Sequence, residues 1–154
     1  MDIATKLDAG VVCDLQNRRT FCPAEADRAI VLLKRVVGDC VSEYSRLQDL
    51  HEAVEAAEGA AAWDRWEEAR TGLIRSAGRL RGYLQELHDV GVELRDWTAG
   101  VVDFPAMAGE RPVWLCWRLG EEHVEWWHEG EECEVRRPMS ELPAYQHPQP
   151  AFRG

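Results

Sequence analysis

The side chains best suited to chemistry lie between Asp103 and His128. Asp103, Glu121 and His128 form a carboxylate and imidazole set that could hold a divalent metal if their strands adjoin. Arg118 would then clamp an anion in a metal-assisted hydrolase. Charged groups beside aromatic rings are more often ion-paired, so the competing interpretation is a pair of Asp103 with Arg118 or Arg111 that locks a β-hairpin. No Ser–His–Asp set, P-loop or dinucleotide motif occurs, so an enzyme is the less favoured alternative, and no cofactor is predicted apart from this candidate metal.

Four tryptophans lie in the same segment, at positions 114, 117, 126 and 127. They could stack on a ligand, but packing in a small sheet is favoured because indole rings bury a large area. Strand alternation cannot place all four on one face, so some indole is expected to be exposed and to mark an interface. The candidate binding residues are Asp103, Arg111, Trp117, Arg118, Glu121, Trp127 and His128.

Two amphipathic helices must position this segment. Phe21-Cys22-Pro23-Ala24-Glu25 is typical of a helix start, with Pro in the first turn and Glu25 three residues after the cap. Gly91 is expected to end the second helix. Each helix carries apolar residues at alternating spacings of three and four, which is typical of one buried face. These residues are Ile30, Leu33, Val37, Cys40, Tyr44, Leu47, His51 and Val54, and then Trp66, Ala69, Leu73, Ala77, Leu80, Leu84 and Leu87.

After Gly91 the apolar period changes from 3.6 to 2. The segment 112–119 is the strongest predicted strand, and 123–128 returns beside it after a turn at Gly120. The predicted fold class is therefore α+β, in which a long antiparallel two-helix, coiled-coil-like hairpin precedes a small antiparallel β-meander of three or four strands. The expected organisation is a partly ordered leader 1–20, one domain 21–137 with the hairpin at about 22–91 and the sheet at about 92–129, and a Pro-rich tail 138–154.

Composition limits the classes of partner that this chain is expected to bind. The 154-residue chain has a net charge of −10, which argues against direct nucleic-acid binding because phosphate would repel it. No apolar run is long enough for a membrane span, and no secretory signal is visible. Five scattered cysteines without a CxxC pair indicate free thiols in a reducing cytoplasm. The long hairpin has one apolar seam, so a homodimer is predicted, serving as an interaction or scaffold protein whose Trp-rich sheet binds another protein.

The same residues carry a resemblance to a known family. Gly100-Val101-Val102-Asp103-Phe104-Pro105, then Arg111, then 115–121 (Leu-Cys-Trp-Arg-Leu-Gly-Glu) and Trp127-His128 resemble the signature of the domain of unknown function 2203 family. The helix start 21–26 is also similar, with Cys22 where Thr is usual. The chain departs from the pattern near Arg137, which no glycine precedes. The resemblance spans about 21–138 and implies a helical hairpin with a sheet, but no activity.

Overall fold

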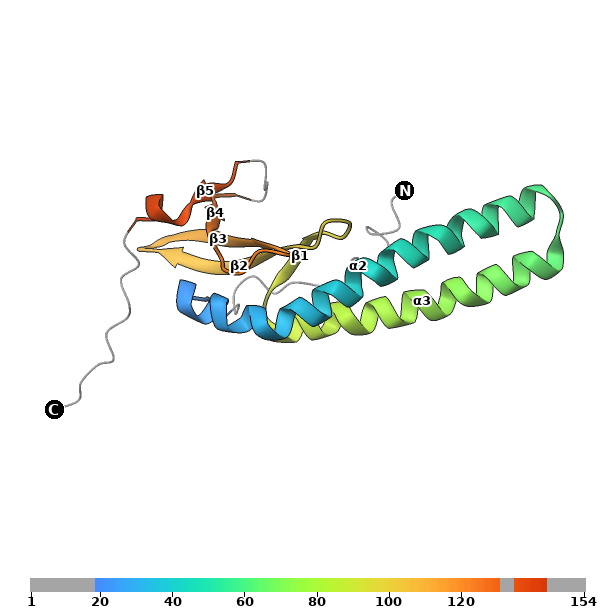
Figure 1. The fold of residues 1–154 in the computed structure, drawn as a ribbon, viewed down its shortest axis with the longest axis horizontal. Helices are drawn as coiled ribbons and strands as arrows, with labels where there is room; N and C mark the ends of the chain where they lie inside the picture. Colours follow the sequence, from blue (N-terminus) through green and yellow to red (C-terminus); the bar gives the residue numbers. More distant parts are fainter. Residues whose placement is uncertain (1–18, 131–134, 144–154) are drawn as a thin grey trace.

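The two predicted helices and the sheet that follows them are confirmed in a computed structural model, which describes residues 19–130 and 135–143 (Figure 1). The order along the chain is α2 (Pro23–Gly59), α3 (Trp63–Val90), five strands and a short 3₁₀ helix, η1 (Met139–Glu141). Most of the predicted leader and of the predicted Pro-rich tail lies outside the described residues. Among the residues described, no helix combines the length and the apolar character that crossing a bilayer requires.

The helix ends follow from local chemistry. At the start of α2 the Glu25 carboxylate accepts a hydrogen bond of 3.3 Å from the Cys22 backbone N–H, which is half of a capping box. The Phe21 ring meets Phe104 of the sheet at 5.3 Å between ring centroids, and this contact fixes the angle at which the chain enters the helix. Gly91 ends α3 with φ of 93°, a left-handed conformation that glycine adopts without a steric penalty.

The sheet is an antiparallel meander of five strands, one more than the upper expectation of four. Its strands are β1 (Glu93–Asp96), β2 (Val101–Ala108), β3 (Arg111–Arg118), β4 (Trp126–His128) and β5 (Arg137–Pro138), and they lie in the order of the sequence. The fifth strand has two residues and falls beyond the predicted end of the sheet at 129. The returning strand also begins later than predicted, at Trp126 rather than at His123.

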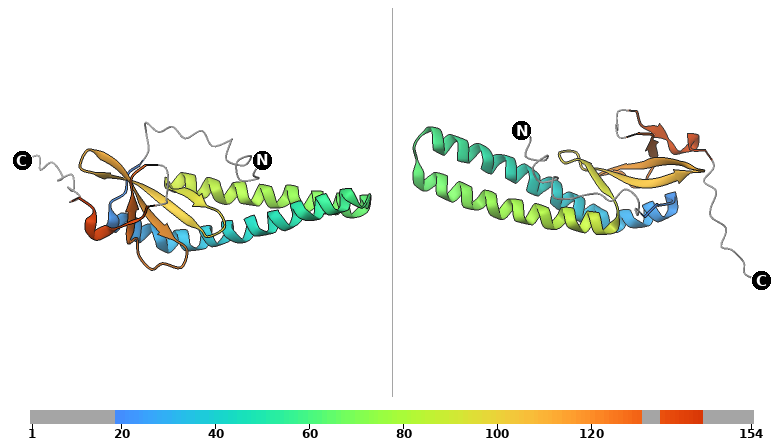
Figure 2. Two further views of the ribbon diagram at one scale, coloured as in Figure 1. Left: turned by 90° about the horizontal axis from the view of Figure 1, so that it is seen from above. Right: turned by 180° about the vertical axis from the view of Figure 1, so that it is seen from behind.

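One face of the sheet packs on the helices, and this face is apolar. Alternation directs Val102, Phe104, Val113, Leu115 and Trp117 to the same side, and all five are buried in one core with residues of α2 and α3. Figures 1 and 2 show the sheet lying along the N-terminal half of α2 and near the C-terminal end of α3. We call this the inner face of the sheet and the opposite side the outer face.

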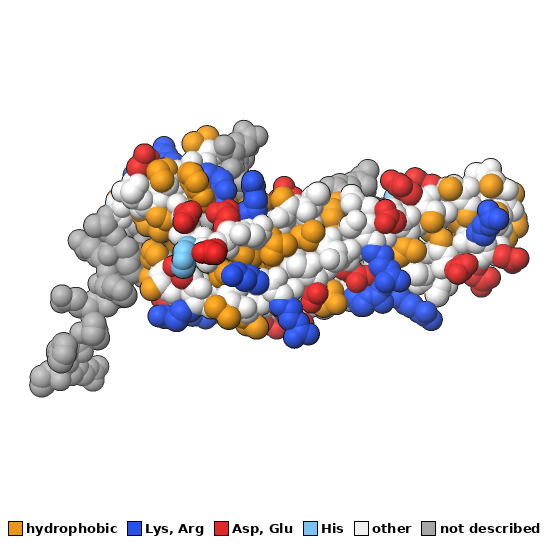
Figure 3. Space-filling model, viewed as in Figure 1, with side chains coloured by type: hydrophobic (Ala, Val, Ile, Leu, Met, Phe, Trp, Pro, Cys, Tyr) orange, Lys and Arg blue, Asp and Glu red, His pale blue; other side chains and the backbone are white. Residues whose placement is uncertain are grey.

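The rest of the hairpin extends past the sheet as a two-helix arm, formed by residues 48–75 (Figure 2). Within the arm only two small residues, Ala57 and Ala69, are buried. The large apolar residues of its seam are half-buried, because among residues 19–130 and 135–143 no third element covers them; these are Leu50, Val54, Trp66 and Leu73. Figure 3 shows hydrophobic side chains in separate patches along the hairpin, among side chains of both charges.

Candidate functional site: a buried polar cluster on the outer face of the sheet

The outer face of the sheet carries polar side chains where the inner face carries apolar ones. In the register, Glu93 of β1 lies opposite Asp103 of β2, which lies opposite Cys116 of β3. His128 of β4 lies opposite Trp114, two residues from Cys116, and therefore on the same face. Asp103 and Cys116 have no exposed surface, and His128 is only 1% exposed. A carboxylate that is buried from water needs partners of opposite charge or hydrogen-bond donors to remain ionised at low cost.

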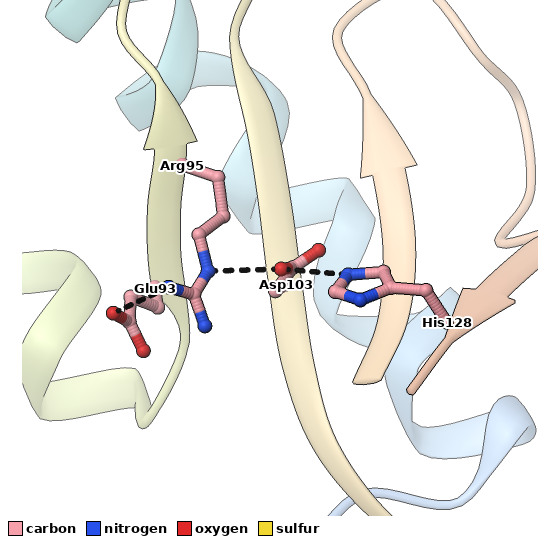
Figure 4. Close-up of polar contacts among 4 residues, drawn as sticks. All are labelled: Glu93, Arg95, Asp103 and His128. Atoms are coloured by element: carbon pink, nitrogen blue, oxygen red, sulfur yellow. Dashed lines mark hydrogen bonds and ion pairs between the residues drawn. The ribbon is translucent and has the colours of Figure 1, made fainter. Parts of the chain in front are cut away.

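Asp103 is held from two sides (Figure 4). The Arg95 Nε donates a hydrogen bond of 2.9 Å to Asp103 Oδ2, and His128 Nε2 lies 2.9 Å from the same oxygen. Arg95 Nη1 also lies 3.3 Å from the Glu93 carboxylate. An Arg–carboxylate hydrogen bond in a site excluded from water is strong, because charge assistance is not weakened by solvent.

A β-bulge directs Arg95 to this position. The pairing of β1 with β2 shifts between Leu94 and Asp96, so that Arg95 is an extra residue in its strand. Bulges bend a strand and re-aim a side chain. The Arg95 guanidinium also lies 4.7 Å from the centre of the Trp114 ring, a cation–π contact that holds the side chain over the sheet.

Cys116 completes the cluster. Its sulfur, one oxygen of Asp103 and one ring nitrogen of His128 all lie within 4.8 Å of one another. Adjacent strands are about 4.8 Å apart, so β2 and β4 lie about 10 Å apart with β3 between them. The Asp103 and His128 side chains can meet over β3 because the residue beneath them, Cys116, is small.

Arg136 covers the other side of the cluster. Its guanidinium lies 5.2 Å from the centre of the Trp126 ring, and its Nη2 lies 2.8 Å from Glu121 Oε1. Burial lowers the pKa of Arg136, but the hydrogen bond to Glu121 and the interaction with the Cys116 thiol outweigh burial and raise it. Two arginine–tryptophan stacks, Arg95 on Trp114 and Arg136 on Trp126, therefore flank the buried cluster.

The structure brings two of the predicted site residues together, Asp103 and His128, and places the others elsewhere. Glu121 accepts a hydrogen bond of 3.0 Å from the Arg118 backbone N–H and binds Arg136, so it is not part of the cluster. Trp117 and Trp127 are buried in the core. Arg118 is exposed, and Arg111 is paired with Glu129.

The predicted pair of Asp103 with Arg118 or Arg111 is wrong, since Arg95 is the residue bonded to Asp103. Sequence reasoning missed Arg95 because its strand is short and irregular. The alternation of Glu93, Leu94 and Arg95 was the available signal, because it places both charges on one face of a strand. Cys116 was missed as a neighbour of the acid because a cysteine in a buried strand is usually a small apolar residue.

Together these features define the class of protein: a helical hairpin with a five-stranded meander that buries an Arg–Asp–His cluster on its outer face. The model of an uncharacterised conserved protein family, DUF2203, matches residues 19–139, so the chain belongs to that family. Neither a curated protein nor a solved structure matches the chain.

Proposed function

We propose that this chain is a homodimeric interaction protein of the cytoplasm, in which the helical arm pairs with a second copy and the sheet binds another protein. The observation that carries the proposal is the incomplete burial of the arm. Between residues 48 and 75 every large apolar residue of the seam keeps part of its surface in water. A two-helix layer needs a further layer to bury its apolar stripe, and two such arms side by side would form a four-helix bundle.

Exposed apolar residues on α3 indicate which side of the arm pairs. Trp63 and Ile74 are 64% and 60% exposed. They are eleven residues apart, close to three full turns, and therefore lie on the same side of the helix. The half-buried Trp66 contacts Trp63 edge to face, which extends this apolar side toward the seam. A second copy related by a two-fold axis would cover the same side of both arms.

The sheet supports the binding part of the proposal. Tryptophan and arginine contribute most of the binding free energy at many protein interfaces, and the outer face carries both in stacked pairs. Cys22, Cys40 and Cys116 are free thiols, which fits a reducing compartment. The dimer would present two such faces, one from each copy.

Light scattering after size exclusion, at micromolar concentration, tests the dimer. We expect the wild-type chain to elute with the mass of two chains. Ile74→Lys should shift it to one chain, because burying a large apolar side chain contributes about 1.5–3 kcal/mol and each dimer contains two. The expected loss of dimer affinity is about 100-fold or more.

Leu32→Lys is the matched control, since Leu32 is 61% exposed but lies on α2 alongside the sheet rather than in the arm. It should leave the dimer intact. Far-ultraviolet circular dichroism checks that both variants keep their helices. A wild-type chain that stays monomeric, or a dimer that Leu32→Lys breaks and Ile74→Lys does not, would overturn the proposed mode of pairing.

A further inference from the structure

We infer that Asp103, Cys116 and His128 form a buried binding site for a divalent transition metal of the Zn²⁺ type. The site would lie on the outer face of the sheet, apart from the helical arm, so it does not depend on dimer formation. Each of the three residues offers one ligand atom, from a carboxylate, a thiolate and an imidazole. The three come from neighbouring strands, which hold the ligands more rigidly than a loop would.

The distances suit a small ion. Ligand bonds to Zn²⁺ measure about 2.0–2.3 Å, so two ligands of a tetrahedral ion lie about 3.3–3.8 Å apart. The three candidate atoms already lie within 4.8 Å of one another. The 2.9 Å contact between Asp103 Oδ2 and His128 Nε2 must open slightly for the ion to enter. Side-chain shifts of about 1 Å would bring two atoms 4.8 Å apart to the ligand spacing of a tetrahedral ion, so the strands can stay in register.

The donor set selects the class of metal. Thiolate and imidazole favour Zn²⁺ and related ions, whereas Mg²⁺ and Ca²⁺ prefer sites made only of oxygen. Three protein ligands leave a fourth position, which water can fill. On binding, the Cys116 thiol gives up its proton to solvent, so one divalent ion adds a single net positive charge to the cluster.

When no metal ion is bound, Arg95 balances the negative charge of Asp103. Its guanidinium neutralises the buried carboxylate, which would otherwise be strongly destabilising. A metal ion and Arg95 would compete for Asp103 because both are positive. Arg95 can give way without losing its other partners: it already lies 3.3 Å from Glu93 and stacks on Trp114, and its side chain is 17% exposed. The arginine therefore acts as the counter-ion that the metal displaces.

Cobalt titration of the full-length, tag-free and metal-free chain tests the site, because Co²⁺ reports its ligands by colour. We expect one Co²⁺ per chain, visible absorption typical of tetrahedral cobalt, and a near-ultraviolet band from cobalt–thiolate charge transfer. Added Zn²⁺ should abolish these bands by displacement. Cys116→Ser should lose the thiolate band, and Cys40→Ala should keep it, since Cys40 is buried elsewhere in the core.

Further measurements distinguish loss of the metal site from unfolding of a variant. Circular dichroism establishes that each variant is folded at the titration temperature, and His128→Gln provides a second ligand deletion that should weaken Co²⁺ binding at least tenfold. Arg95→Met should bind Co²⁺ more tightly than the wild type, because it removes the competing cation. The inference is overturned if folded wild-type chain shows no thiolate band, or if Cys116→Ser shows it at undiminished intensity.

Discussion

Replacement of Gly100 by alanine should destabilise the fold through a close approach of helix and sheet. Gly100 precedes β2 with φ of 74° and is three residues before Asp103. A Cβ atom there would lie 3.0 Å from Leu119 Cβ and from Val37 Cγ1. Real Cβ atoms are rarely found so close to a neighbour, so Val37 of α2 and Leu119 after β3 would each have to shift by a few tenths of an ångström.

The size of the effect follows from two contributions. A left-handed conformation costs alanine about 1–2 kcal/mol, and overpacking a well-packed site costs typically another 1–3 kcal/mol. Gly109 provides the matched control, because its φ of 65° is similar and a Cβ there would contact nothing within 4 Å. Gly109→Ala should therefore show only the backbone cost. The difference between the two variants, about 1–3 kcal/mol, isolates the packing contribution, since effects on the unfolded chain cancel.

Urea unfolding monitored by tryptophan fluorescence and by circular dichroism measures this difference. Both variants must be compared at the same protein concentration, because dimer formation would add to apparent stability. We expect the midpoint for Gly100→Ala to fall well below that for Gly109→Ala. Equal midpoints, or a lower one for Gly109→Ala, would refute the argument that contact with Val37 and Leu119 decides the residue at this position.

Two other groups give predictions that are tested by pH and by chemical labelling. A hydrogen bond from Arg79 lowers the pKa of Glu43, which also accepts a hydrogen bond from Ser76. The ionised Glu43 carboxylate therefore stabilises the fold above the ordinary glutamate pKa, and this stabilisation is lost as the pH falls through the lowered pKa. The difference in the free energy of unfolding between wild type and Glu43→Gln, measured with urea, should therefore decrease from about pH 7 to about pH 3. A difference that stays constant over this range would contradict the prediction. Burial, with smaller effects from nearby carboxylates, raises the pKa of Cys40 to about 12. Iodoacetamide should modify Cys40 at about pH 8 only after unfolding, as read by peptide mass mapping, and rapid labelling of the folded chain would count against this.

The helices were predictable because they depend on many residues at regular spacing. From Ile30 to Leu47 every residue of the first predicted stripe is buried. Toward the tip, His51 and Val54 continue the stripe but remain half-buried, because burial there depends on elements beyond the hairpin. A periodic pattern therefore predicts which side of a helix faces inward, whereas the extent of burial depends on what covers that side.

The cluster on the outer face could be predicted only in part, for a physical reason. Asp103 and His128 stand out by residue type, but their meeting depends on the register of three strands and on the small residue between them. The bond of Asp103 to Arg95 depends on a single bulge, and one residue more or less in the turn would direct Arg95 elsewhere. Alternation within β1 indicates that Glu93 and Arg95 share a face, but only the pairing between strands decides which residue Arg95 reaches.

Trp117 and Trp127, which the sequence predicts as binding residues, are instead buried on the inner face and connect the core to this cluster. The Trp117 Nε1 donates a hydrogen bond of 2.9 Å to the Glu121 carbonyl oxygen, which fixes the loop after β3. The Glu121 side chain from that loop binds Arg136, and Arg136 in turn interacts with Cys116. The Trp127 Nε1 likewise bonds the Pro138 carbonyl oxygen and holds β5 beside β4. Packing on one face of the sheet thus positions the charged side chains that cover the other, so Trp117 and Trp127 support the cluster from the inner face.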